Sequence, residues 1–216
     1  MRVCRAGRDV LAILIGLVLA VGSFAPGWAT AVGADAPPSL PGVPASVTVQ
    51  AWLTLDLEGD YHWQSTKLKA GTQSVGVIQV HRGFLIATDN AVEVSDPAFG
   101  IHEVAAGGAI AMGEGQQLEV IAPSGQARLM FVELVAPDEA FANEQPDSTK
   151  DFSVPKGRYT VAVLAIPTGP GAPKPASAIA KAAAPAIAVY PEGAGAATPG
   201  ASVEAATWLV ALFPVA

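Results

Sequence analysis

One segment of the chain alternates apolar and polar residues more regularly than any other. Between residues 46 and 57 every second side chain is apolar, at Val47, Val49, Ala51, Leu53, Leu55 and Leu57. Successive side chains of a β-strand point to opposite faces, so this pattern predicts a long strand with one buried face.

Shorter apolar runs follow, separated by glycines and by pairs such as Asp–Asn and Asp–Pro that favour turns. Residues 129–132 are apolar on both faces, which predicts a central, covered strand. Residues 138–151 are polar and indicate a surface loop or a short helix, and 154–158 indicate a turn. Strands are predicted over 75–80, 84–88, 91–95, 101–105, 109–112, 117–121, 127–135 and 159–166, as in an antiparallel all-β fold.

The composition changes after this region. Fifteen Ala, six Pro and five Gly lie between residues 168 and 207, so segment 167–207 has little large apolar surface and is expected to be flexible. Residues 176–184 favour a short helix that ends before Pro185. Residues 208–216 begin with Trp–Leu–Val–Ala–Leu–Phe, which predicts an apolar terminal strand that pairs with the main fold or lies in an interface.

The first 34 residues have the pattern of an export signal. Three arginines precede an apolar run from Val10 to Val21, and small residues suited to cleavage follow at Ala29–Ala31 and again at Val32–Ala34. The run is shorter than the ~20 residues that span a bilayer, so we expect cleavage and no stable membrane insertion afterwards. Segment 1–34 therefore predicts a secreted or extracytoplasmic protein, and the prolines of 35–45 predict an extended leader.

Charge and cysteine content narrow the function classes. Removal of residues 1–31 takes away three Arg and one Asp, which changes the formal net charge from −7 to −9. An acidic chain is a poor partner for nucleic acid or anionic lipid. The single cysteine, Cys4, lies in the export signal, so apolar burial and not a disulfide must stabilise the mature chain.

Residues 113–122 resemble the second sequence motif of the cupin family, in which two turn residues, a His and an Asn follow at fixed intervals. Gly113 and Gly115 stand at the turn positions, Leu118 at the His position and Ala122 at the Asn position. Residues 77–83 resemble the end of the first cupin motif, with Gly83 as its turn glycine. The resemblance covers roughly residues 53–136 and implies a cupin-like antiparallel barrel of jelly-roll type, which we place at 46–166.

The metal ligands of cupins are missing from the corresponding positions. The family's Glu would fall on Gly76, its His pair among 69–72, and its last His on Leu118. None of these residues is an imidazole or a carboxylate, the ligands that divalent transition metals prefer. The resemblance thus implies a barrel without a metal, and no cofactor and no catalytic residue is assigned.

Five residues remain as candidate ligand contacts. His81 precedes Gly83 at the expected barrel mouth, and His62 and His102 lie on other strands that folding brings near it or leaves on the surface. Trp52 and Trp63 offer stacking faces or core packing. One face of the first strand carries Asp56, Glu58, Asp60 and His62. These residues form either an ion site, if the strand bends at Gly59, or a charged outer surface. The candidates for ligand binding are therefore His81, His62, His102, Trp52 and Trp63.

These observations predict an exported, non-catalytic cupin-like module that binds a small molecule or a protein partner. A secreted cupin-type enzyme, with relocated metal ligands or metal-free acid–base chemistry, is the first alternative. A structural cell-surface protein is the second. The sequence leaves a homo-oligomer open.

Overall fold

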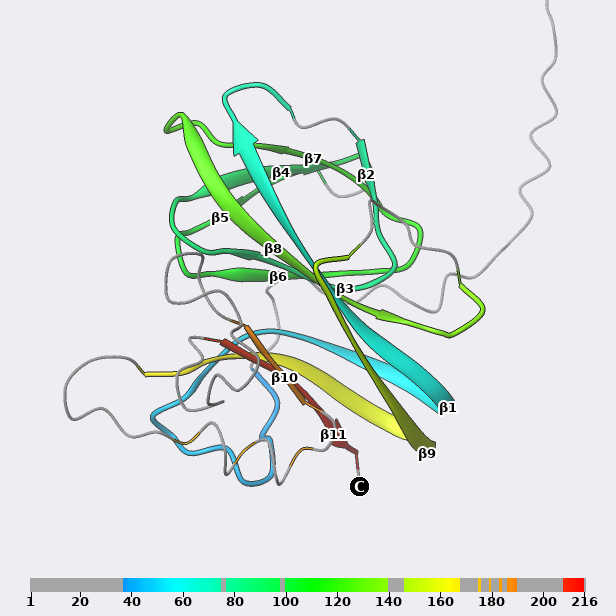
Figure 1. The fold of residues 1–216 in the computed structure, drawn as a ribbon. Helices are drawn as coiled ribbons and strands as arrows, with labels where there is room; N and C mark the ends of the chain where they lie inside the picture. The colour runs from blue at the N-terminus through cyan, green and yellow to red at the C-terminus, as the bar shows by residue number, and fades with distance from the viewer. Residues whose placement is uncertain are drawn as a thin grey trace, which may run out of the picture.

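The structure is a computed structural model. It describes residues 37–74, 77–97, 100–139, 146–167 and 208–215, the backbone of 186–189, and the single residues Pro175, Ile179 and Ala183. These parts form antiparallel β-strands, which confirms the all-β prediction (Figure 1). In chain order the strands are β1 (Thr48–Gly71), β2 (Val77–Gln79), β3 (Arg82–Ala87), β4 (Val92–Asp96), β5 (Gly100–Val104), β6 (Ala109–Met112), β7 (Gln117–Ile121), β8 (Gln126–Val135), β9 (Ser148–Ala165), β10 (Ala186–Val189) and β11 (Trp208–Pro214).

The strands form two sheets. The larger has the order β10-β11-β9-β1-β8-β3-β6 and the smaller the order β2-β7-β4-β5. β1 joins the two halves of the molecule, because Thr48–Ser65 pair with β9 and His62–Gly71 pair with β8 (Figure 1). The alternating pattern up to Leu57 indicated only the first half of this strand. Its continuation depends on side chains such as Trp63 and Ala70, which are buried against different partners.

The smaller sheet and one face of β1, β3, β6 and β8 enclose a first core, the barrel core. Its members come from strands of both sheets, so their side chains fill the space between the sheets. They are Ala70, Ile78, Val80, Leu85, Ala87, Val92, Val94, Val104, Met112, Leu118, Val120, Ala122, Ala127, Leu129 and Phe131.

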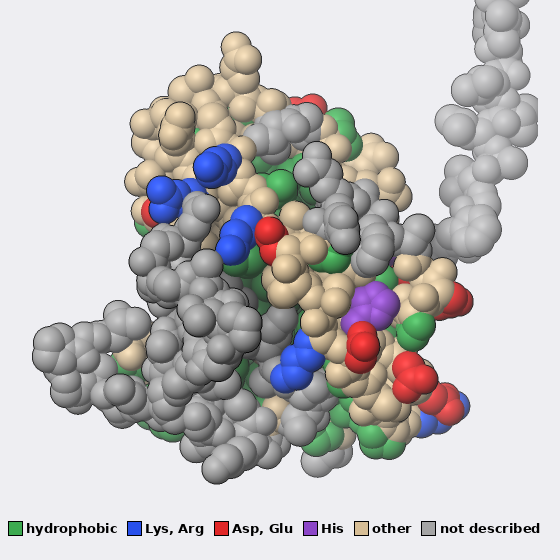
Figure 2. Space-filling view, viewed as in Figure 1, with side chains coloured by type: hydrophobic (Ala, Val, Ile, Leu, Met, Phe, Trp, Pro, Cys, Tyr) green, Lys and Arg blue, Asp and Glu red, His purple; other side chains and the backbone are tan. Residues whose placement is uncertain are grey.

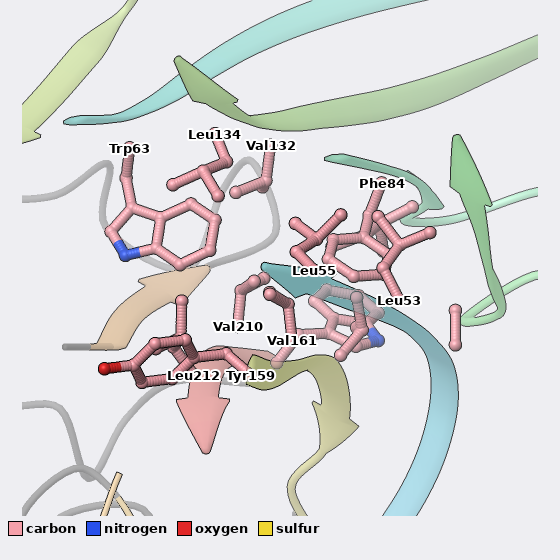
Figure 3. Close-up of a cluster of buried hydrophobic side chains, with 14 of the residues drawn as sticks. Leu53, Leu55, Trp63, Phe84, Val132, Leu134, Tyr159, Val161, Val210 and Leu212 are labelled. Atoms are coloured by element: carbon pink, nitrogen blue, oxygen red, sulfur yellow. The ribbon is translucent and has the colours of Figure 1, made fainter. Parts of the chain in front are cut away.

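The opposite face of β3, β6 and β8 is also buried, in a second core. Here Phe84, Val132 and Leu134 meet side chains of β1, β9 and β11, because the seven-stranded sheet curls back on itself (Figure 3). On β8, neighbouring residues therefore alternate between the two cores: Leu129 and Phe131 in the barrel core, Met130 and Val132 in the second. This double burial confirms the central, covered strand predicted for residues 129–132.

A third core covers the far face of β9 and β11. Leu164, Leu209 and Phe213 pack there with Leu40 and Val47, which precede β1. The segment predicted as an extended leader contains turns where the structure describes it, since the Val43 amide donates to the Leu40 carbonyl at 3.3 Å. Its apolar side chains thus contribute to a core.

Two local predictions were wrong. Residues 148–151, predicted in a loop or short helix, begin β9, and the predicted turn at 154–158 lies within the same strand. Residues 148–151 are extended because they pair with His62–Ser65 of β1. The turn-like residues Pro155 and Lys156 form a β-bulge, at a register shift between Leu57 and Gly59. A proline in a strand is tolerated at such a bulge, where its missing N–H breaks no ladder hydrogen bond.

Segment 1–34 and most of 167–207 lie outside the described residues, so processing and flexibility there stay predictions. Within 167–207, β10 pairs with β11. The amide of Ile179 donates to the Pro175 carbonyl and that of Ala183 to the Ile179 carbonyl, at 2.9 and 2.7 Å. This i→i−4 spacing agrees with the predicted short helix. Across the described parts of the chain, no helix is long and apolar enough to cross a membrane.

Candidate functional site

The three histidines lie on different parts of the fold. His62 is on β1 between Val135 of β8 and Asp151 of β9, whereas His102 is on the edge strand β5 opposite Val94. His81 lies between β2 and β3. In the described ranges, no group of three or more His, Cys, Asp or Glu residues is arranged to hold a metal ion.

The two candidate tryptophans lie on opposite faces of β1 and take part in packing. Trp63 is fully buried in the second core, with its ring centroid 5.5 Å from that of Phe152 (Figure 3). Trp52 is half-buried against the third core. Neither tryptophan is a member of the barrel core.

Two positions of the second cupin motif, those of its His and its Asn, are apolar and inside the barrel. Leu118 is 2% exposed and Ala122 is fully buried, both in the barrel core. Lys69, in the stretch that corresponds to the His pair, is exposed, and Gly76 lies outside the described residues. The described inner surface at Leu118 and Ala122 therefore offers a metal no ligand.

Polar side chains do enter the barrel at one end. Gln64 of β1 and Glu133 of β8 are cross-strand partners, so their side chains share one face. That face is the barrel-core face, because Phe131 and Leu129 lie two and four residues before Glu133 along β8. Gln64 is 3% exposed, Glu133 2% and the neighbouring Thr66 7%. We call Gln64, Thr66 and Glu133 the barrel-end cluster.

Backbone geometry holds Glu133 in place. The amide of His81, one of the predicted site residues, donates a hydrogen bond to Glu133 Oε1 at 3.0 Å. Gly83, the register partner of Glu133 on β3, has no side chain to occupy this space. An added Cβ would lie 2.8 Å from Glu133 Cα and against the Val132 carbonyl. Gly83 was interpreted as a turn glycine, but it lies within β3 and permits close strand approach.

Charged groups on the other side of β3 link two connecting segments to this end of the barrel. Arg82 donates to Glu139 at 3.0 Å, beyond the end of β8, and its Nε lies 3.5 Å from Glu114 in the β6–β7 turn. Glu139 also accepts a hydrogen bond from the Ala136 amide at 2.8 Å. The β6–β7 turn, which contains Gly113 and Gly115, is also bonded to the segment that follows β2, because the Gly115 amide donates to the Val80 carbonyl.

None of the residues in this cluster is among the candidates predicted from the sequence. A carboxylate, an amide and a hydroxyl lie together in an otherwise apolar interior, and Gln64 Nε2 is buried with no hydrogen-bond partner in the structure. One signal was available: Glu133 is the single charged residue in the apolar run from Leu129 to Val135. Charged residues are rarely buried on a central strand without a specific reason.

The acidic series on β1 is mostly an outer surface. Asp56, Glu58 and Asp60 are exposed, and Gly59 between them has φ of +95°, so the predicted bend is present. The side-chain ammonium of Lys156 lies 3.3 Å from Glu58. The series therefore forms a mixed-charge surface at the β-bulge.

Comparison with known proteins gives similarity in fold only. No family model matches the sequence, and a search of characterised proteins finds no relative. A cupin 2 conserved barrel domain protein from Salinispora arenicola is 16% identical over 40% of this chain and 76% of its own, with a TM-score of 0.28. A cupin protein from Bacteroides fragilis is 15% identical over 49% of this chain and 93% of its own, also with a TM-score of 0.28. A protein from Neisseria meningitidis is 14% identical over 38% of this chain and 81% of its own, with a TM-score of 0.31. Two of these three neighbours are cupin proteins by name, and all three TM-scores are below 0.5.

Proposed function

We propose that this protein is an exported, non-catalytic binding module that holds a small polar molecule at the barrel-end cluster. The observation that carries the proposal is the pair Gln64 and Glu133, buried side by side in an apolar barrel. Export follows from the signal-like segment 1–34.

Burial of these two side chains is costly in free energy. A buried carboxylate loses its hydration, and a buried amide donor without a partner costs roughly 1–3 kcal/mol. A barrel selected for stability alone would carry apolar residues here, as it does at Leu129 and Phe131 on the same face. A polar ligand that accepts a hydrogen bond from Gln64 Nε2 offsets this cost.

The chemical groups at the barrel end suit a small polar ligand. The close approach of β3 at Gly83 and the contacts of Arg82 hold the segments that flank the cluster in place. A ligand there would meet one carboxylate, one amide and one hydroxyl, with apolar side chains behind them. This arrangement matches ligand sites in general, where a few polar groups orient a molecule against an apolar wall.

The test is thermal denaturation of the mature protein with a panel of amino acids, sugars, polyols and small carboxylic acids. A ligand at 100 times its dissociation constant adds about 2.7 kcal/mol to the free energy of unfolding. We expect Glu133→Gln and Gln64→Leu to remove the stabilisation. Glu119→Gln, the same change on the exposed face of β7, should keep it.

Native mass spectrometry of the protein as purified provides the second measurement. A bound small molecule that is present with the parent and absent with Glu133→Gln supports the proposal. The proposal fails if no member of the panel stabilises the parent and no bound molecule is found. It also fails if Glu133→Gln responds as the parent does.

A further inference from the structure

A concave surface lies outside the barrel core, at the β-bulge between β1 and β9. It is a groove of about 420 Å³, lined by Asp56, Leu57, Glu58 and Tyr61 of β1 and by Lys156 and Arg158 of β9. We call it the bulge groove. Figure 2 shows acidic and basic side chains gathered over this region of the β1–β9 pair.

Hydrogen bonds fix the shape of the bulge. Ser153 Oγ donates to the Gly59 carbonyl at 3.3 Å, and the Tyr159 hydroxyl donates to the Pro155 carbonyl at 2.8 Å. Gly59 adopts φ of +95°, a conformation that favours glycine, and an added Cβ would meet no atom within 4 Å. The groove is therefore a built feature of the paired strands and not a loose loop.

An ordered aromatic ring forms part of the groove. Tyr61 is half-buried and stacks on Phe152 with ring centroids 6.2 Å apart and an interplanar angle of 29°. Phe152 in turn contacts the fully buried Trp63 at 5.5 Å. This row of three rings anchors Tyr61 in the second core, so its remaining exposed surface is a preformed contact face.

The charges of the groove balance. Glu58 pairs with Lys156 at 3.3 Å, and Asp56 lies across the strands from Arg158. Two carboxylates and two cations give no net charge and supply acceptors and donors in nearly equal number. The side chains of Lys156 and Glu58 are 82% and 65% exposed, so both are accessible.

We propose that the bulge groove binds a neutral carbohydrate. The C–H face of a sugar ring packs on an aromatic ring, and its hydroxyls both donate to carboxylates and accept from ammonium or guanidinium groups. An anionic ligand would meet Asp56 and Glu58, whereas a cationic one would meet Lys156 and Arg158. This site is separate from the barrel-end cluster and does not depend on the function proposed for it.

The test is affinity electrophoresis of the mature protein in native gels that contain a neutral α-glucan, β-glucan, mannan or xylan. We expect at least one polysaccharide to retard the parent, and the binding to survive raised salt. Tyr61→Ala should weaken binding roughly tenfold or more, whereas Tyr61→Phe keeps the stacking ring and should bind within about threefold of the parent. Arg158→Gln, a change outside the aromatic row, should also weaken it.

Two controls separate the possible outcomes. Glu133→Gln should be retarded as the parent is, which distinguishes this groove from the barrel-end cluster. Near-ultraviolet circular dichroism should show that Tyr61→Ala is folded. If Tyr61→Ala does not fold, the polysaccharide binding of Arg158→Gln still tests the groove. The proposal is overturned if no neutral polysaccharide retards the parent, if Tyr61→Ala is folded and binds equally well, or if only an anionic polysaccharide such as dextran sulfate is bound.

Discussion

The indole N–H of Trp208 donates a hydrogen bond to the carbonyl of Gly107 at 3.1 Å, across 101 residues of sequence. Trp208 begins β11, near one end of the seven-stranded sheet, and Gly107 lies in the turn before β6 at the other end. This contact joins the two ends of the curled sheet. The second core, with Val210 and Leu212 on one side and Phe84 on the other, lies between them (Figure 3).

Two substitutions at Trp208 should therefore lower the free energy of unfolding by different amounts. Trp208→Phe keeps most of the apolar contact and removes the donor, so we expect a loss of about 1 kcal/mol in the free energy of unfolding. Trp208→Ala removes the packing as well and should cost about 3–5 kcal/mol. Urea denaturation measures both, with Val215→Ala, at a 45% exposed side chain, as the unaffected control.

Deletion of residues 207–216 tests the terminal strand as a whole. β11 pairs with β9 along its length and buries Leu209, Val210, Leu212 and Phe213, so its removal exposes apolar side chains of two cores. We expect a lower melting temperature or aggregation. A truncated protein as stable, soluble and monomeric as the parent would show that the strand is dispensable for folding.

Gly83 should tolerate no side chain. In Gly83→Ala the new Cβ would lie 2.8 Å from Glu133 Cα, and backbone atoms of a central strand cannot move aside cheaply. We expect a loss of about 2–4 kcal/mol in the free energy of unfolding, measured by urea denaturation. Gly71→Ala is the matched control on β1, because its nearest contact would be 3.9 Å away. Equal stability of the two variants would contradict this explanation of the glycine.

Strand positions were predictable because each depends on a local pattern. The β6 and β7 bounds equal the predicted 109–112 and 117–121, where apolar runs end at glycine-containing turns. The error at 154–158 has the opposite origin. Pro155 and Gly157 are turn residues by composition, and only pairing with β1 across a bulge keeps them in a strand.

The candidate site was less accessible to sequence reasoning because it depends on long-range register. Glu133 is buried beside Gln64 through the pairing of β8 with β1, and beside Gly83 through its pairing with β3. No local pattern fixes these registers. The histidines attracted attention by residue type, yet His62 and His102 belong to different sheets.

The purified protein should contain no stoichiometric transition metal. Leu118 and Ala122, at two cupin motif positions, are buried among apolar side chains. A chelator should leave the melting temperature unchanged, and elemental analysis should find well under one Mn, Fe, Ni or Zn per chain. About one ion per chain would defeat this expectation and redirect attention to the histidines.

Gln64 offers the last prediction, because stability and ligand binding should respond to it in opposite ways. Its Nε2 is buried without a hydrogen-bond partner, so Gln64→Leu replaces an unpaired amide with an apolar group of similar volume. We expect the free energy of unfolding without ligand to stay equal or to rise by up to ~2 kcal/mol. Gln64→Ala instead leaves a cavity and should lower it by about 1–3 kcal/mol. Urea denaturation of both variants measures the difference. If Gln64→Leu is destabilised as much as Gln64→Ala, the amide serves the fold itself, and the case for a ligand at the barrel-end cluster loses its main support.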